Sequence, residues 1–254
     1  MLEKKITFKA SKDYIENNKD ILPIPAKQNV PDWFKKLTHS TENFTVKGCL
    51  PFLDTLTSGY ILKMPIDYGI EHNVVVDGEK KTGFKSSQTN TSLRDTVNIN
   101  CHGDDNFHGT NQIKNSPLLN KNCNLPVHKI LNPWVIKTPP GYSTLFVPPL
   151  NNTDDRFSII PGIVDTDTFN VHINFPFIVN GDKYPYLKTV LKRGLPYVQI
   201  IPFKRDRWKM IIEEETEQKI KTNRFYLQKY LIDNYKRVYW NKKSWKWIVL
   251  YINT

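Results

Sequence analysis

The chain has 254 residues, a mass of 29.7 kDa, a formal net charge of +11 and a pI near 9.4. Its hydrophobic fraction of 39% and aromatic fraction of 12% suffice for a packed core, which excludes a wholly disordered chain. No stretch approaches the roughly 20 consecutive apolar residues of a membrane-spanning helix, so we expect no membrane partner. The three cysteines, Cys49, Cys101 and Cys123, are too few for a disulfide framework, which favours a reducing compartment.

Residues 1–43 are predicted to form an irregular N-terminal segment that contains one short helix. Pro31 and Asp32 suit the first turn of that helix, because proline fits there and an acidic side chain favours the positive end of the helix dipole. Three residues are expected on its buried side: Trp33, Phe34 and Leu37.

Residues 44–205 alternate short apolar runs with Pro, Gly, Asn and Asp, which is typical of an all-β barrel or sandwich. The predicted strands lie at 59–64, 73–76, 134–137, 143–147, 171–175 and 197–201. Within this domain, residues 77–125 are poor in apolar residues and rich in Asn, Ser, Thr and Lys. We interpret them as a long polar insertion or mobile loop.

Residues 206–254 are predicted to form a basic, aromatic, helical extension. Residues 188–254 hold 16 Lys and Arg against 6 Asp and Glu, so they carry nearly all of the excess charge. The residues that recur at helical spacing predict one amphipathic helix over 211–240: Ile220, Leu227, Leu231, Asn234 and Val238. Such a basic segment either attracts phosphates or simply keeps the protein soluble.

Four segments, taken in chain order, have the character of known motifs. Residues 50–60 read LPFLDTLTSGY and residues 138–142 read TPPGY, while 162–167 read GIVDTD and 191–199 read LKRGLPYVQ. In this order they resemble the motifs of the dUTPase and dCTP deaminase (beta-clip) superfamily. The resemblance implies a mainly β fold, namely a dUTPase-like β-barrel of the beta-clip or jelly-roll type, followed here by the C-terminal amphipathic helix.

The resemblance also implies an active site and an assembly. Asp165 would orient and activate the water that attacks the α-phosphorus, with Asp167 as the second catalytic acid. Gln199, Tyr60 and Gly141 would bind the substrate nucleotide. Magnesium would bridge the phosphates, and a homotrimer would form its sites between subunits.

The spacing of the two acids gives an independent reason to examine them. Asp165 and Asp167 are two residues apart, so on a strand both carboxylates would project from one face. Two like charges on one face need a cation or a hydrogen-bond donor between them. Alternatively, Asp-Thr-Asp is a turn whose side chains accept backbone amides. We expect the stiff Pro139–Gly141 turn and this acidic pair to come together in a single closed sheet whose opening could admit an anion.

Two departures from the family pattern argue against triphosphatase activity. The second motif normally carries an Arg-Ser-Ser phosphate clamp, whereas residues 147–152 contain neither arginine nor serine. No glycine follows Gly194, so no glycine-rich segment can close over phosphates. We therefore predict a binding or assembly module on a dUTPase-like scaffold. The alternatives are a magnesium-dependent nucleotide hydrolase that uses Asp165, and a nucleic-acid-binding accessory protein.

A second resemblance covers most of the chain and gives a context without a chemistry. Residues 31–36 (PDWFKK), 132–134 (NPW), 173–177 (INFPF) and 199–205 (QIIPFKR) are similar to an uncharacterised family of phage and bacterial proteins. This resemblance implies a phage-type protein located in the cytoplasm of the host cell or in the virion.

The C-terminal extension interleaves aromatic and cationic side chains. Five of its residues form the candidate nucleic-acid-binding set: Lys236, Arg237, Lys242, Lys243 and Trp245. Bases stack on aromatic rings while cations hold phosphates, so this segment could bind single-stranded nucleic acid. Alternatively, its aromatic side chains pack on the body and its lysines remain in water.

A zinc site is not predicted from the remaining cysteine and histidine residues. Those near one another in the chain are Cys101, His102, His108, Cys123 and His128. None of them forms the tight Cys-x-x-Cys pair that structural zinc sites usually contain, so scattered loop residues are the simpler interpretation.

Overall fold

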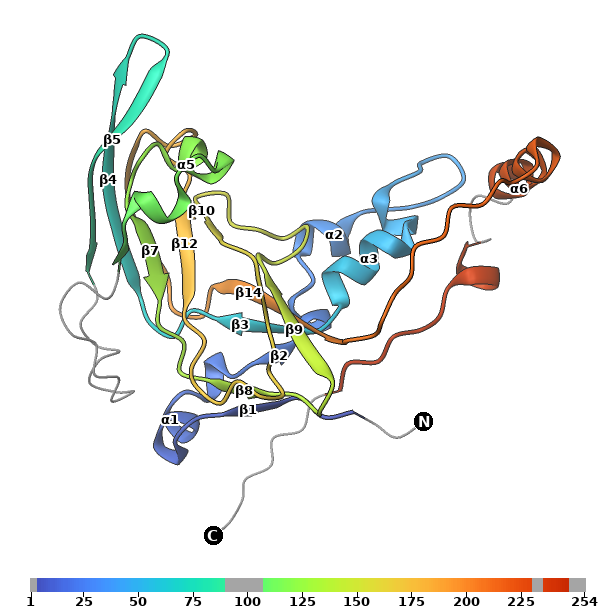
Figure 1. Cartoon of the computed structure of the whole chain (residues 1–254), viewed down its shortest axis with the longest axis horizontal. Helices are drawn as coiled ribbons and strands as arrows, with labels where there is room; N and C mark the ends of the chain where they lie inside the picture. Colours follow the sequence, from blue (N-terminus) through green and yellow to red (C-terminus); the bar gives the residue numbers. More distant parts are fainter. Residues whose placement is uncertain (1–3, 90–106, 230–234, 247–254) are drawn as a thin grey trace.

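The computed structural model describes residues 4–89, 107–229 and 235–246 (Figure 1). The fold is mainly β, as the sequence predicts. Its strands are β1 (Thr7–Lys9), β2 (Ile24–Pro25), β3 (Tyr60–Lys63), β4 (Tyr68–Asp77), β5 (Lys80–Thr89), β6 (Phe107–His108), β7 (Val127–Ile130), β8 (Val135–Lys137), β9 (Tyr142–Val147), β10 (Phe157–Ile159), β11 (Gly162–Val164), β12 (Phe175–Val179), β13 (Tyr186–Leu191) and β14 (Pro196–Lys204).

The helices are short, with one exception near the C-terminus. They are α1 (Lys12–Asn17), α2 (Asp32–Lys36), α3 (Leu50–Thr57), α5 (Pro117–Asn122) and α6 (Glu217–Lys229). Short 3-10 helices occupy Lys19–Ile21, Ala26–Asn29, Val46–Gly48 and Thr110–Ile113, and a π-helical turn, η5, spans Tyr235–Tyr239. No helix in the described part of the chain is long and apolar enough to cross a membrane.

The described strands form four antiparallel sheets. The largest has the order β11-β9-β14-β3-β2, the second β10-β12-β7-β6 and the third β13-β4-β5, while β1 pairs with β8. In the largest sheet β14 is central, since Gln199 lies opposite Val147 of β9 on one side and Ile61 of β3 on the other. The described strands do not close into a barrel, because β11 and β2 end this sheet as edges. The expectation of a closed barrel is therefore not confirmed.

A buried aromatic cluster joins the two larger sheets. The ring of Phe175 on β12 lies 5.3 Å from that of Phe146 on β9 and 5.6 Å from that of Tyr197 on β14. Phe177 on the same strand contacts Phe157 of β10 at 5.5 Å. Each such ring removes roughly 150–250 Å² from water, so this cluster holds β9 and β14 rigidly. Both strands lead into the site described below.

The structure corrects the expectation of a long loop over residues 77–125. β4 and β5 form a hairpin that projects at the upper left of Figure 1, and α5 follows further along the chain. The hairpin turns at Gly78 and Glu79, and Gly78 has φ +58°. Glycine at the first position of a two-residue turn is a hairpin signal that the polar composition obscured. Residues 90–106 lie outside the described part of the chain.

The N-terminal segment contains the predicted helix with a smaller buried side. α2 begins at Asp32 and buries Phe34, but Trp33 is 46% exposed, so its predicted burial is wrong. The Trp33 ring instead lies edge-on against Phe52 of α3, 6.1 Å away. α3 itself was not predicted, although Pro51 in its first turn is a recognised helix-start signal.

Five of the six predicted strands are confirmed, and the sixth is misplaced. β3, β4, β8, β9 and β14 contain the strands predicted near those positions. The strand expected at 171–175 begins only at Phe175, where β12 starts. Asn174 lies just before it, and its side chain accepts a hydrogen bond from the Asn132 backbone at 3.2 Å. Such a bond from a side chain to the backbone stabilises a loop and takes the place of strand pairing.

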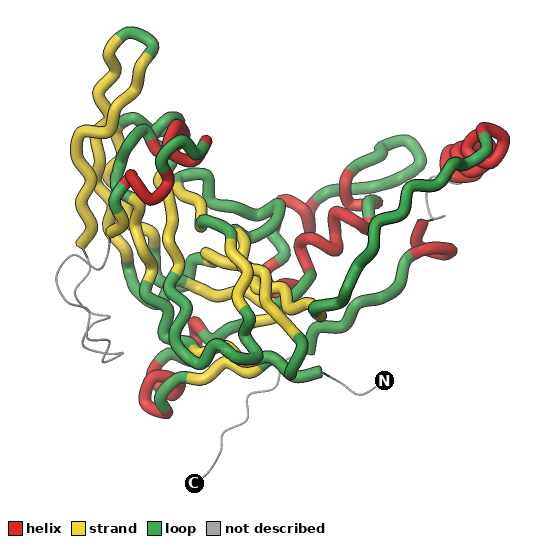
Figure 2. Tube along the Cα trace, viewed as in Figure 1, coloured by secondary structure: helices red, strands yellow, loops and turns green. Residues whose placement is uncertain are grey.

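Beyond β14 the chain leaves the body as an arm, which comprises an outgoing leg (residues 205–216), α6 and a returning leg (residues 235–246). Figure 2 draws most of both legs as loop, with α6 at their far end. The single helix predicted over 211–240 is therefore wrong at its start, because α6 begins at Glu217. The two adjacent β-branched isoleucines at 211–212 disfavour helix because they lose rotamer freedom there. Residues 230–234 lie outside the described residues.

Candidate functional site

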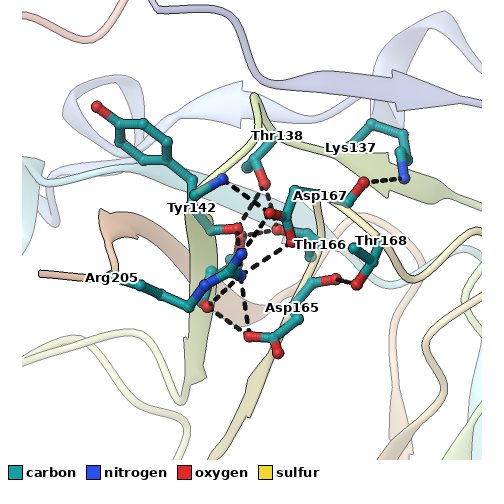
Figure 3. A network of polar contacts seen from close by, with 11 residues as sticks. Lys137, Thr138, Tyr142, Asp165, Thr166, Asp167, Thr168 and Arg205 are labelled. Carbon is teal, nitrogen blue, oxygen red and sulfur yellow. Dashed lines mark hydrogen bonds and ion pairs between the residues drawn. The ribbon is translucent and has the colours of Figure 1, made fainter.

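The Pro139–Gly141 turn and the Asp165–Asp167 segment lie side by side, as the sequence predicts (Figure 3). The Gly141 backbone N–H donates to Oδ2 of Asp167 at 2.8 Å. Gly141 has φ +81°, a conformation that glycine adopts without strain. The first contact of the site is thus a carboxylate that accepts a backbone amide of the turn.

The buried Thr166 links the acidic segment to the strands on either side of the Pro139–Gly141 turn. The Thr166 hydroxyl lies 2.7 Å from the hydroxyl of Thr138, just after β8, and 2.7 Å from that of Thr144 on β9. The Thr138 backbone N–H donates to the Thr166 carbonyl at 3.3 Å. Because Thr166 is fully buried, its two hydroxyl partners fix the positions of the flanking acids.

Arg205 lies between the two acids, where a metal ion would otherwise be expected (Figure 3). Its Nη1 donates to Oδ1 of Asp167 at 2.9 Å and lies 3.1 Å from Oδ1 of Asp165, while its Nη2 pairs with Oδ2 of Asp167. The same Nη1 donates to the Ser143 hydroxyl at 3.0 Å and to the Tyr142 carbonyl at 3.2 Å. This is the bidentate fork geometry that makes arginine–carboxylate pairs strong.

The electrostatics of the pair follow from this arginine. The hydrogen bond from Arg205, aided by the Gly141 amide, lowers the pKa of Asp167 from 3.8 to about 2. The same carboxylate raises the pKa of Arg205. Asp167 is therefore ionised at every physiological pH and cannot serve as a proton donor there.

The two acids lie in a turn, not on a strand. β11 ends at Val164, and the backbone N–H groups of Thr168 and Phe169 donate to the Asp165 carbonyl at 3.1 and 2.9 Å. Asp165 is the more exposed acid, with 61% of its side chain accessible, and it accepts a 2.6 Å hydrogen bond from Ser143. The alternative that acids in this segment accept backbone amides thus describes Asp167 correctly.

Gln199 is buried in the largest sheet, and its amide already has partners at both ends. Its Oε1 accepts from the Leu150 backbone at 2.8 Å. Its Nε2 donates to the carbonyls of Thr55 at 2.9 Å and Ser58 at 2.6 Å. These bonds tie α3 and the loop after β9 to β14. Both amide donors and the carbonyl oxygen are engaged, so binding a nucleotide through Gln199 would break an existing contact.

A second group of contacts fastens the returning leg to the body. Asp54 of α3 accepts hydrogen bonds from Trp240 Nε1 at 3.1 Å and from Lys243 Nζ at 2.6 Å. Tyr60 donates its hydroxyl proton to the Lys246 carbonyl at 3.1 Å, and its ring lies 6.0 Å from that of Trp245. Tyr60 therefore contacts the arm, at a different place from Asp165 and Arg205.

The predicted nucleic-acid-binding residues divide into two groups. Lys243 and Trp245 face the body through the contacts just described, which fits the alternative that part of this segment packs on the protein. Lys236, Arg237 and Lys242 are exposed on the returning leg. The described structure contains no cluster of three or more His, Cys, Asp or Glu side chains suited to a metal ion, and Cys101 and His102 fall outside it.

The sequence did not single out Arg205 or Asp54, the two residues of opposite charge at which the legs of the arm are fastened. Arg205 directly follows the QIIPFK run of β14, whose last residue, Lys204, lies opposite Tyr142 of β9. The only signal in the sequence was a cation at the end of a predicted strand. Asp54 carries no comparable signal, because its partners on the returning leg lie 186 and 189 positions further along the chain. Contacts of such long range are fixed by the packing of whole elements, not by local pattern.

The outgoing leg carries several largely exposed apolar side chains. Trp208 is 91% exposed, Met210 83%, Ile212 87% and Ile211 66%. Such side chains are ordinarily scattered singly on a protein surface. Here four of them lie within five residues, interrupted only by Lys209.

Fold and site together define a mainly β protein with an arm fastened to the body at both ends. A scan of protein-family models gives no match to the chain, and a search of curated proteins gives none either. The dUTPase-like and phage-type resemblances therefore rest on their motifs alone.

Proposed function

We propose that the protein is a binding or assembly module of phage type on a dUTPase-like scaffold, and that its arm is the part that binds. The observation that carries this proposal is the exposed stretch Trp208–Ile212, in which four of the five side chains are apolar. A contiguous exposed apolar patch is characteristic of a protein interface. The arm is also fastened at Arg205 and at Asp54, so it is presented to a partner and not left as a free tail.

The state of the acids supports this reading over nucleotide hydrolysis. A hydrolytic carboxylate must be free to orient water and to share a metal ion with phosphates. Here Arg205 forms ion pairs with both acids, and Ser143 occupies one Asp165 oxygen. The residues would hold a magnesium ion only if Arg205 moved away. In this proposal, Asp165 and Asp167 fix the root of the arm.

The test measures two properties of the native chain, of Asp165→Asn and of a Trp208→Ser/Ile212→Ser variant. The first is phosphate release from a panel of nucleoside triphosphates with magnesium, and the second is the mass of the particle in solution by light scattering. We expect no phosphate release from any of them, and a particle mass that falls only in the arm variant. Phosphate release that disappears in Asp165→Asn would refute the proposal, as would a mass that ignores the arm.

One observation favours nucleic acid as a second candidate partner. Tyr235 and Tyr239 are both exposed, with ring centroids 6.4 Å apart, and Lys236 lies between them in the chain. Exposed rings beside cations suit stacking on single-stranded bases. Oligonucleotide binding that weakens steeply with salt and is lost in Tyr235→Ser/Tyr239→Ser would support this candidate. Binding that survives both substitutions would remove it.

A further inference from the structure

We infer that the arm joins two copies of this chain, by antiparallel pairing of their outgoing legs about a two-fold axis at Met210. This inference rests on the proposed assembly function and names its partner. The pairing is independent of the homotrimer that the family resemblance implies, because it uses residues outside the β-rich body.

The first step is the alternation of side chains along the outgoing leg. In an extended chain, side chains two positions apart share a face. Trp208, Met210 and Ile212 therefore form one apolar face, and these are the three most exposed apolar side chains of the leg. Arg207 and Glu213 fall on the opposite face. The leg thus has the pattern of a half-buried strand that lacks a neighbour.

The second step is that the leg is complementary to itself. Arg207 precedes the apolar stretch and Lys209 lies within it, while acids follow it from Glu213 onward. When a second copy runs antiparallel, the basic half of one leg meets the acidic half of the other. A parallel pairing in register would instead oppose Arg207 to Arg207 and Glu213 to Glu213, which is repulsive.

The third step fixes the register. With Met210 opposite Met210, Trp208 lies opposite Ile212 and Arg207 opposite Glu213, so the apolar face stays apolar and the charges pair. A shift of two residues would place Trp208 opposite Glu214 in one direction, or Ile212 opposite Asp206 in the other. This register therefore keeps the face of Trp208, Met210 and Ile212 apolar and pairs Arg207 with Glu213, while Lys209 lies opposite Ile211 on the other face.

The charged residues of this register are available for pairing. Arg207 and Glu213 are exposed and form no ion pair within the described part of the chain. Asp206, which would face Glu214, already forms an ion pair with Lys204 at the end of β14 in its own chain. Like-charge repulsion at that position is thereby reduced.

A two-stranded ribbon is only marginally stable by itself, so its apolar face needs a cover. α6 begins after a connection of four residues, 213–216, and carries exposed Ile220 and Phe225. It is the element nearest in the chain to that face. The interface is isologous, because the same surface of both copies meets itself, and it closes at two chains.

The geometry gives a direct cross-linking test on the full chain, with Cys49 and Cys101 replaced by serine. In antiparallel pairs, directly opposed Cα atoms lie about 4.5–5.5 Å apart, within the roughly 4.4–6.8 Å that a disulfide spans. Met210→Cys should therefore form a covalent dimer under mild oxidation. Lys209→Cys is the matched control, because its counterpart lies diagonally, about 7–8 Å away, and should cross-link far less.

A charge exchange provides the second measurement, by sedimentation equilibrium at low salt. Arg207→Glu and Glu213→Arg should each weaken self-association about tenfold, because each creates two like-charge pairs in the symmetric dimer. Mixing the two variants should restore it, because every Arg207–Glu213 position then opposes unlike charges. The native chain should reach a mass of twice 29.7 kDa.

Three results would overturn the inference: a native chain that stays at the mass of one copy, equal cross-linking at 209 and 210, or variants whose mixture does not recover. A particle mass that depends on Trp208 but ignores the charge exchange would leave the assembly function in place and remove only this pairing. Phosphate release dependent on Asp165 would instead refute the assembly function itself.

Discussion

His128 provides a quantitative test of the core, because it is a titratable side chain enclosed by aromatic rings. Its ring stacks on Phe177 with centroids 5.0 Å apart, contacts Phe107 at 5.0 Å, and its Nδ1 lies 3.2 Å from the Tyr68 hydroxyl. Burial, aided by the nearby His72, lowers the pKa of His128 from 6.5 to about 3. The folded protein therefore holds this imidazole neutral across the physiological range.

The sign of the pH effect follows from that shift. Below pH 6.5 the unfolded chain binds a proton at His128 and the folded chain does not, until the pH approaches 3. The stability contributed by the neutral ring is complete above pH 6.5 and is lost as the pH falls toward 3. At about 1.4 kcal/mol per pH unit, the loss from this one group between pH 7 and pH 5 is about 2 kcal/mol.

The assay is urea unfolding followed by tryptophan fluorescence at pH 7, 6 and 5. His128→Phe keeps an aromatic ring in the cluster and removes the titrating group. The free energy of unfolding falls in both proteins as the pH drops from 7 to 5, and the fall should be about 2 kcal/mol smaller in the variant than in the native chain. His172→Phe is the control, because His172 is exposed, and it should retain the native slope. An unchanged slope in His128→Phe would refute the assignment of a neutral buried imidazole.

Three further substitutions test the sheet and the arm. Gln199→Leu should lower the free energy of unfolding by about 2–4 kcal/mol in urea titrations, because three partly buried backbone groups lose their partner; a loss under 1 kcal/mol would contradict the assigned bonds. Gly59→Ala should destabilise by at least about 2 kcal/mol in the same assay, since its Cβ would lie 2.0 Å from the Ile200 carbonyl oxygen at φ +72°. Asp54→Ala should release Trp240, seen as a red shift in fluorescence with little change in unfolding free energy; an unchanged spectrum would contradict the second fastening.

The parts of the fold that the sequence predicted are those with local causes. β9 and β14 contain short runs rich in apolar residues between turn signals, and the Pro139–Gly141 turn has a rigid backbone, so the strands and the turn were all predicted. The polar hairpin of β4 and β5 was missed because its projecting end has water on both sides, which leaves no apolar alternation to detect. The C-terminal helix was predicted to begin at residue 211 although the residues at helical spacing begin only at Ile220, and the β-branched pair Ile211–Ile212 disfavours helix.

The candidate site was located from the sequence, but the part that Arg205 plays was not. The two acids and the turn beside them were identified from a motif and lie together in the structure. Their partner depends on where β14 ends, because the last ladder position, Lys204 opposite Tyr142, sets the guanidinium beside the acids. A sequence pattern indicates which residue types form such a site. Which cation pairs with which carboxylate depends on the register between strands that are far apart in the chain.

The two fastenings of the arm have a consequence for affinity. When a free tail binds a partner, every residue that becomes ordered loses conformational entropy, and this loss reduces the binding free energy. Here Arg205 at one end and Asp54 at the other already restrict the segment between them. A synthetic peptide of residues 205–216 has the same side chains without those restraints, so it should compete only weakly with the intact chain.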